Sequence, residues 1–372
     1  MRIGIDARFY GSFGKGLGRY TEKLIKHLEK IDYNNNYYIF LRKENWASYQ
    51  PANKKFTKVL ADYKWYSFVE QVFFPLKIWQ YRVDLMHFTH FNVPFLYYKK
   101  FIVTIHDLIL AKYPTRRATT LSPISYKIKH IAYSIIIKSA VRRAKKIIAV
   151  SKYTKRELVR HFNLDPEKIS VTYEAVDPTW QDFSNQEEVL KKYHVLTPYI
   201  LYVGNVYPHK NIEGLLVAFK QVLNKLSGYK LVLVGKDDYF FKRLKKEVKL
   251  MDLEEHVIFT GFVTDHDLPY LYKNAALYIF PSFCEGFGLP ALEACSYGIP
   301  VAASNSSCLP EVLDKAAIYF NPKSTAAIAD AIINVLTSKK IVQDLKRQGL
   351  ERVKFFSWET LAKKTLDLYA KK

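Results

Sequence analysis

Two glutamates placed eight residues apart, Glu285 and Glu293, mark the stretch of this chain in which chemistry is expected. The residues before them, Leu277–Phe280, form an apolar run that is typical of a buried strand. Pro290, between the glutamates, suits the first turn of a helix, where a missing N–H costs nothing. The order is therefore strand, loop and helix N-terminus, and such a terminus offers free N–H groups to an anion, typically phosphate.

The loop contains Gly286 and Gly288, which let the backbone come close to a ligand. Carboxylates beside a phosphate site cannot bind the phosphate, but they can accept hydrogen bonds from sugar hydroxyls. One carboxylate on each side of the phosphate predicts a pocket for a nucleotide sugar. The alternative interpretation is an ordinary strand–turn–helix of an α/β protein.

The full pattern, Glu-x7-Glu enclosing Gly-Phe-Gly-Leu-Pro at 286–290, resembles the signature of retaining GT-B glycosyltransferases of glycosyltransferase family 4, which include bacterial mannosyltransferases. The resemblance implies an α/β fold of GT-B type. Two doubly wound Rossmann-like domains would face a cleft, with a C-terminal helix crossing back to the N-domain. It also implies that Glu285 holds the hydroxyls of the donor sugar and Glu293 those of the ribose.

Two more residues are candidates for catalysis. His106 follows an apolar strand within Thr-Ile-His-Asp-Leu, and Asp107 is an acid that could orient its ring. This segment resembles the family motif whose His contacts the donor sugar and the acceptor side. Lys210 follows a strand end, where an ammonium can stabilise the departing diphosphate. We expect His106, Glu285 and Lys210 to be catalytic; a core histidine and a solvent-exposed lysine are the ordinary alternatives.

The resemblance also implies which residues contact the donor. A glycine-rich loop with Gly14 and Gly16 is expected to close over the diphosphate. Asn205 stands where the family often has Arg, so either His209, Arg19 or another group supplies that charge, or the transition state is less well stabilised. The expected donor-binding residues are Gly14, Gly16, Asn205, Lys210, Phe262, Val263, Glu285, Gly286, Phe287, Gly288, Leu289 and Glu293.

Apolar runs that alternate with helical patterns predict two parallel sheets with covered faces. The first series of strands is expected at residues 3–7, 37–41, 83–88, 101–105, 146–151 and 169–175. The second is expected at 199–204, 230–235, 257–263, 277–282, 300–304 and 316–320. Pro75 is expected to kink or end a helix within 65–79.

At 372 residues the chain suggests two domains. We expect an acceptor-side domain at 1–178, a donor-binding domain at 179–356 and a C-terminal helix at 357–372 with Ser357 as its N-cap. The polar residues 181–192 are the expected linker.

The net charge of +22 is concentrated in the first half, where residues 1–178 hold 32 Lys and Arg against 14 Asp and Glu. Such a field attracts anionic partners, although the charge can also serve solubility alone. Isoleucines recur at helical spacing within the basic stretch, and we expect part of this stripe to be core and the rest to lie on an anionic membrane surface. The four are Ile124, Ile128, Ile131 and Ile135. Weaker candidates for the acceptor side are His90, Arg116 and Arg117.

The expected reaction is transfer of a hexosyl group, with GDP-mannose as the preferred donor and a UDP-hexose as the alternative. The acceptor would be a glycan or lipid-linked precursor of a polysaccharide, and no cofactor or metal is expected. The chain opens directly with a strand, so we expect no signal peptide, and a location in the cytoplasm or on the inner membrane face. A sugar-nucleotide epimerase, a transferase scaffold without activity and a nucleic-acid-binding protein remain as alternatives, although no nucleic-acid-binding motif is present.

Overall fold

The structure, a computed structural model, describes residues 1–372 except 12–13, 116, 118, 120–121, 178–184 and 371–372. The chain separates into two compact units. The first contains Met1–Lys112, Pro123–Glu174 and Ser357–Lys372, and the second contains Tyr113–Ser122 and Ala175–Phe356. Among the described residues, no helix combines the length and the apolar composition that crossing a bilayer requires.

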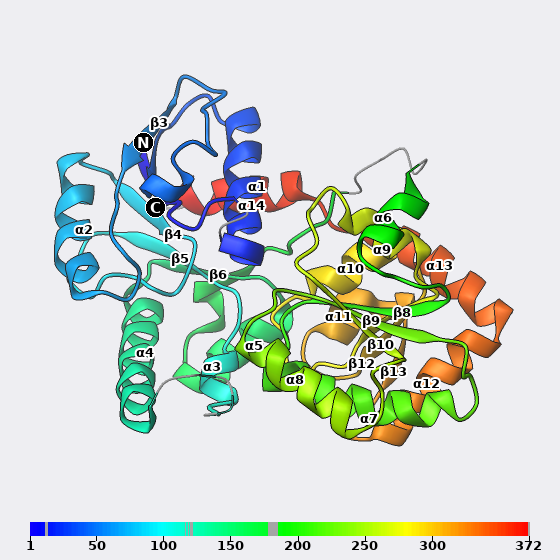
Figure 1. Ribbon diagram of the computed structural model, residues 1–372. Helices are drawn as coiled ribbons and strands as arrows, with labels where there is room; N and C mark the ends of the chain where they lie inside the picture. The colour runs from blue at the N-terminus through cyan, green and yellow to red at the C-terminus, as the bar shows by residue number, and fades with distance from the viewer. Residues whose placement is uncertain (12–13, 116, 118, 120–121, 178–184, 371–372) are drawn as a thin grey trace. The chain divides into compact units, whose positions relative to one another are not determined.

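The first unit is built on a seven-stranded parallel sheet in the order β3-β2-β1-β4-β5-β6-β7 (Figure 1). Its strands are β1 (Arg2–Asp6), β2 (Asn36–Leu41), β3 (Phe56–Leu60), β4 (Leu85–Phe88), β5 (Phe101–Ile105), β6 (Lys146–Ala149) and β7 (Ile169–Val171). Its helices are α1 (Lys15–Ile31), α2 (Phe68–Gln80), α3 (Ile109–Lys112), α4 (Pro123–Arg143), α5 (Lys152–Phe162) and α14 (Trp358–Ala370), with short 3-10 turns η2 (Lys43–Asn45) and η4 (Pro166–Lys168).

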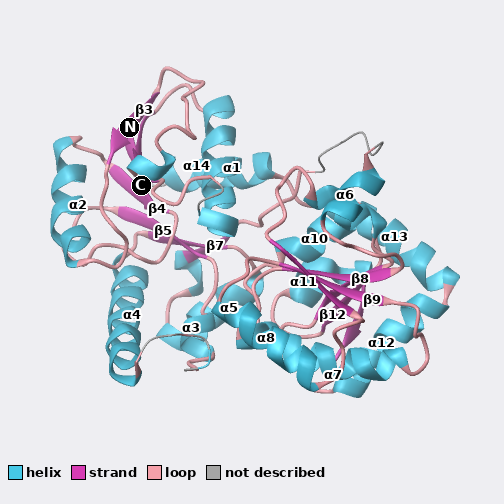
Figure 2. Cartoon of the chain, in the orientation of Figure 1, coloured by secondary structure: helices cyan, strands magenta, loops and turns pink. Residues whose placement is uncertain are grey.

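The second unit holds a six-stranded parallel sheet in the order β10-β9-β8-β11-β12-β13. Its strands are β8 (Tyr199–Val203), β9 (Lys230–Val234), β10 (Val257–Gly261), β11 (Leu277–Phe280), β12 (Val301–Ser304) and β13 (Ala317–Phe320). Its helices are α6 (Gln186–Lys192), α7 (Ile212–Leu223), α8 (Tyr239–Leu250), α9 (Leu268–Asn274), α10 (Leu289–Ser296), α11 (Leu309–Leu313), α12 (Thr325–Thr337) and α13 (Lys339–Val353), with 3-10 turns η5 (Pro208–Lys210) and η6 (Asp314–Ala316). Figure 2 shows the strands of each unit flanked by its helices.

The predicted α/β fold with two parallel sheets is confirmed. Both sheets are buried, because the strands that alternate with helices carry apolar side chains on both faces; β5 and β11 are buried along their whole lengths. In each sheet the order in which the chain adds strands switches once from one edge to the other. The switch lies between β1 and β4 in the first sheet and between β8 and β11 in the second. Ligands of open α/β sheets bind at the carboxyl ends of strands beside such a switch point.

The last helix, α14, belongs to the first unit, as predicted. Ser357 caps it by accepting a hydrogen bond from the Thr360 N–H at 3.3 Å. The helix packs along α1, and its Tyr369 hydroxyl lies 2.6 Å from Nδ1 of His87, at the end of β4. His87 Nε2 is 2.9 Å from the Thr104 hydroxyl of β5. Side-chain hydrogen bonds through His87 therefore connect α14 to the two central strands β4 and β5.

Four local expectations were wrong. The edge strand β3 was missed; it is short, and charged and polar residues interrupt its apolar pattern. Pro75 lies inside α2, which continues through it to Gln80. The expected linker contains helix α6, and helix α1 begins at Lys15, so that Gly16 belongs to its first turn and not to a loop.

Candidate active site

The second unit places Lys210 and Glu285 on the loops that follow its two switch-point strands. Lys210 closes the turn η5 after β8, and Glu285 lies between β11 and α10. The Lys210 ammonium is 2.7 and 2.9 Å from the two carboxylate oxygens of Glu285. The predicted pair of donor residues therefore forms one bidentate ion pair, a contact that the sequence did not indicate.

Other side chains hold the two loops together. Asn211 is buried, and its amide donates hydrogen bonds to the carbonyls of Pro281, at 3.2 Å, and Pro322, at 2.7 Å. The Glu285 N–H donates to the Ser307 hydroxyl at 3.0 Å. Sequence reasoning missed both anchors, because an Asn or a Ser in a loop gives no signal of its distant partner.

The loop before α10 depends on one glycine. Gly288 is the N-cap of α10 and has φ +94°, a conformation that favours glycine. A Cβ there would lie 2.8 Å from Cδ2 of Leu309. Gly286, Phe287 and Leu289 are buried around it. The predicted strand–loop–helix arrangement is thus present, and α10 begins at the end of this loop.

Glu293 lies on α10, where Tyr272 of α9 donates a hydrogen bond to its Oε2 at 3.0 Å. Phe287 turns its ring edge-on to Phe356, with ring centroids 5.5 Å apart, so its side chain packs within the unit. Two of the predicted base contacts differ in burial: Phe262 is 71% exposed, whereas Val263 is buried.

His209, the neighbour expected to supply a positive charge near Asn205, is not charged at neutral pH. Burial, and then the charge of Lys210, lower the pKa of His209 to about 4, so that its ring is neutral at pH 7. Asn205 itself accepts a hydrogen bond at its carbonyl from the buried Tyr202 hydroxyl at 2.6 Å. His209 therefore does not supply at pH 7 the positive charge that was expected of it.

The first unit holds His106 at the carboxyl end of β5. Its Nδ1 lies 3.0 Å from the Glu174 carboxylate, and its Nε2 lies 3.0 Å from the Thr89 carbonyl. Burial alone would lower the pKa of His106, but the hydrogen bond and charge of Glu174, together with the Thr89 carbonyl, raise it. With acceptors at both nitrogens, the ring is satisfied as an imidazolium. Asp107, expected to orient this ring, accepts instead from the Ile109 N–H at 2.9 Å.

His90, the weaker acceptor-side candidate, packs among aromatic rings. Its ring centroid lies 5.2 Å from that of Phe9, 6.4 Å from that of Tyr66 and 4.0 Å from that of Phe91. Burial lowers the pKa of His90 to about 3, and the charges of His106 and Arg8 add to this effect. His90 is therefore a neutral part of an aromatic cluster.

The glycine-rich segment after β1 is only partly described, since residues 12–13 lie outside the described residues. Gly14 is the N-cap of α1, and a Cβ there would lie 2.0 Å from the Phe9 carbonyl oxygen. Gly16 has open space around the equivalent position. Close packing thus explains Gly14 but not Gly16.

Arg117 lies in the second unit, although it was predicted for the acceptor side of the first. Its guanidinium pairs with Glu213 of α7 at 2.6 Å, and Arg243 of α8 pairs with the same carboxylate at 3.1 Å. Arg116 lies outside the described residues.

Both halves of the chain match models of known glycosyltransferase families. Residues 14–180 match the family model described as Glycosyltransferase Family 4, and residues 186–352 match that of Glycosyl transferases group 1. O-antigen chain mannosyltransferase B of Escherichia coli is 31% identical over 377 residues, which cover 95% of each chain. O-antigen chain mannosyltransferase RfbU of Salmonella typhimurium is 32% identical over 248 residues, covering 66% of this chain and 63% of that one.

Solved structures share the fold at lower identity. Sucrose-phosphate synthase from Thermosynechococcus elongatus aligns with a TM-score of 0.78 and 20% identity, covering 99% of this chain and 98% of that one. WaaG, a glycosyltransferase involved in lipopolysaccharide biosynthesis, aligns with a TM-score of 0.74 and 14% identity over 100% of both chains. These neighbours extend the fold agreement to the whole length of the chain.

Proposed function

This chain belongs to the family 4 glycosyltransferases, and from that premise we propose that it transfers a mannosyl group from GDP-mannose to a glycan or lipid-linked acceptor, with retention of configuration. The sugar is supported by relatives named as mannosyltransferases that align over 95% and 66% of the chain. The first unit would recognise the acceptor, and the second would bind the donor.

The observation that carries the proposal is the contact between Lys210 and Glu285. A nucleotide sugar needs a cation for its diphosphate and an acceptor for its sugar hydroxyls a few ångströms apart, because the diphosphate and the sugar share one oxygen. Lys210 and Glu285 supply these two groups side by side, at the strand ends where α/β sheets bind ligands. Donor binding would replace the ion pair with two separate contacts.

The chemistry then follows from the charges. Negative charge grows on the diphosphate as the bond to the sugar breaks, and Lys210 and the N–H groups at the start of α10 stabilise it. The acceptor hydroxyl attacks the oxocarbenium-like sugar from the face that the diphosphate leaves, and its proton passes to the departing diphosphate. Glu293 would hold the ribose hydroxyls. His106, held by Glu174, would contact the donor sugar.

The proposed reaction needs no metal, because Lys210 and α10 neutralise the diphosphate directly. We therefore propose that activity persists in EDTA.

We also propose that the protein contacts the inner face of an anionic membrane through its first unit. The four isoleucines of the α4 stripe are all exposed, and the buried apolar residues of α4 are Ile137, Ala140 and Val141 instead. The expectation that part of the stripe is core was wrong. An apolar stripe on a basic helix suits the interface of an acidic bilayer.

Thermal unfolding with nucleotides tests the donor. At about a hundred times the dissociation constant, a ligand adds roughly 2.7 kcal/mol, or about 2–4 °C for a protein of this size. We expect GDP and GDP-mannose to give the shift and UDP sugars to give none. If only UDP-hexoses shift the unfolding temperature, the donor is a UDP-hexose and not GDP-mannose. NMR of the product anomer tests retention, and an inverted product would contradict the mechanism.

A further inference from the structure

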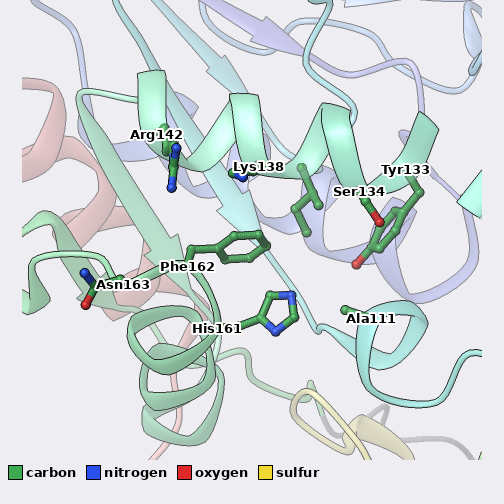
Figure 3. Close-up of a pocket in the computed structure, with 9 residues that line it drawn as sticks. Ala111, Tyr133, Ser134, Lys138, Arg142, His161, Phe162 and Asn163 are labelled. Carbon is green, nitrogen blue, oxygen red and sulfur yellow. The ribbon is translucent and has the colours of Figure 1, made fainter. Parts of the chain in front are cut away.

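A pocket of about 290 Å³ opens between α4 and α5 in the first unit. Figure 3 shows Arg142 and Ser134 pointing from α4 toward the side where Phe162 and His161 lie. The residues that line it are Ala111, Tyr133, Ser134, Ile137, Lys138, Arg142, His161, Phe162 and Asn163.

The pocket gathers basic groups without a carboxylate. Its charged or titratable side chains are Lys138, Arg142 and His161, and no Asp or Glu lines it. Within the part of the chain that the structure describes, none of these three side chains has an ion pair. Neighbouring bases are paired: Lys112 lies 2.6 Å from Glu157, and Arg143 donates to the Phe95 carbonyl at 2.7 Å. Two cations and an imidazole that line one pocket without a counter-ion favour an anionic ligand.

The pocket combines an apolar floor with nitrogen donors, a combination that suits a phosphate ester. Its floor is apolar, because Ile137 and Phe162 are 1% and 8% exposed. Lys138, Arg142 and Asn163, whose side chains carry N–H donors of several kinds, also line the pocket. Arginine and lysine are the residues that bind phosphate most readily.

The exposed isoleucines continue directly into this pocket. Ile131, Ile135, Lys138 and Arg142 are separated by four, three and four residues, which places them along one ridge of α4. Ile131 and Ile135 are 50% and 53% exposed. The ridge therefore changes from apolar to cationic along its length, as a surface that holds both an acyl region and a headgroup requires.

We propose that this pocket binds the phosphate of an anionic phospholipid, with Lys138 and Arg142 on the headgroup and Ile131 and Ile135 in the acyl region. The proposal rests on the membrane contact proposed above and makes it specific: one pocket, not diffuse charge, selects the lipid. It is independent of the donor chemistry of the second unit.

Vesicle sedimentation with the full chain tests it, with phosphatidylcholine vesicles that contain or lack 30% phosphatidylglycerol. Each basic residue near an acidic membrane contributes about fivefold in affinity, so Lys138→Gln/Arg142→Gln should bind roughly thirtyfold more weakly. The matched control is Lys54→Gln/Lys55→Gln, which removes the same charge. Those lysines are exposed and precede β3, at the opposite edge of the sheet from β6 and β7. The control should bind within about twofold of the parent.

Each other outcome has one meaning. Equal losses in the two double variants would show diffuse electrostatics and overturn the pocket. Failure of the parent to bind acidic vesicles would overturn the membrane contact itself, while the thermal shift with GDP-mannose on the same sample still tests the transferase. Binding of inorganic phosphate without vesicles, as tight as vesicle binding and lost in Lys138→Gln/Arg142→Gln, would make the ligand a soluble phosphate. Ile131→Ser/Ile135→Ser should weaken vesicle binding only, and an unchanged affinity would overturn the acyl contact.

Discussion

Lys210 and Glu285, 75 residues apart in the chain, form a bidentate ion pair in which the two side chains are only 15% and 8% exposed. The pair joins the loops after β8 and β11, so it couples the stability of the second unit to the groups proposed to bind donor. Loss of one partner leaves the other charge without compensation in a nearly buried position. Function and stability can therefore be separated by comparing single and double substitutions.

Lys210→Met should lower kcat by about 10²–10³, the usual cost of removing one group that stabilises developing charge. It should also reduce the free energy of unfolding by roughly 1–3 kcal/mol, because Glu285 loses its partner. Lys210→Met/Glu285→Gln should recover much of that stability while remaining inactive. GDP release and urea unfolding measure the two effects, with Lys225→Met, an exposed site in the same unit, as the control. Full activity in Lys210→Met would remove this residue from the mechanism.

Gly288→Ala should distort the donor loop. The alanine would need φ near +94° and would bring its Cβ to 2.8 Å from Leu309, at a cost of about 1–3 kcal/mol. We expect a lower Tm and a smaller thermal shift with GDP-mannose. Gly228→Ala is the matched control, because no atom lies within 4 Å of its added Cβ. Equal effects of the two substitutions would mean that the left-handed conformation of Gly288 is not required.

The raised pKa of His106 predicts a pH dependence of stability. A His whose pKa is higher in the folded state contributes stability below its unfolded pKa of about 6.5 and loses it as pH rises through the folded value. The free energy of unfolding should therefore fall as pH rises above about 6.5. His87 and His90, whose pKa values burial lowers to about 3, act in the opposite direction below about pH 6.5.

Glu174→Gln should remove most of this slope, because the amide cannot supply the carboxylate charge. Urea unfolding between pH 6.5 and 8.5 measures the slope, and NMR titration of the His106 ring measures its pKa directly. An unchanged His106 titration in Glu174→Gln would show that the carboxylate does not set it.

Tyr369→Phe should destabilise the first unit by about 1–3 kcal/mol, since it removes the hydroxyl from the buried Nδ1 of His87. Tyr33→Phe, at a position that is 65% exposed, should change stability by less than about 0.5 kcal/mol. Both are measured by urea unfolding. Equal stability of Tyr369→Phe and the parent would show that α14 is held by apolar packing alone.

The sequence predicted most strands because parallel strands buried on both faces are short apolar runs between turn residues. The edge strand β3 was missed because only Phe56 and Val59 of its five residues are buried, and Thr57 and Lys58 interrupt the apolar run. Sequence reasoning also failed for the isoleucines of α4, since helical spacing shows that residues share a face but not whether that face is buried. Pro75 does not end α2, so of the two expected effects, a kink or a helix end, the second was wrong.

Within the site, the motif identified Glu285 and the order of strand, loop and helix. The partners were not predictable, because they depend on tertiary contact. Glu174 reaches His106 across 68 residues, and no local pattern distinguishes it from the nearer Asp107. Motifs thus indicated the candidate residues, whereas the side chains that pair with them could be found only from the fold.

The return of α14 to the first unit sets an order of events during synthesis. His87 leaves the ribosome 282 residues before Tyr369, which is roughly 14–56 s at ordinary elongation rates. Throughout that interval the face of α1 that α14 covers is exposed to solvent and to chaperones. The second unit needs no residue beyond Phe356, so it can complete its fold first. The second unit can therefore finish folding before the first, although most of the first unit is translated earlier.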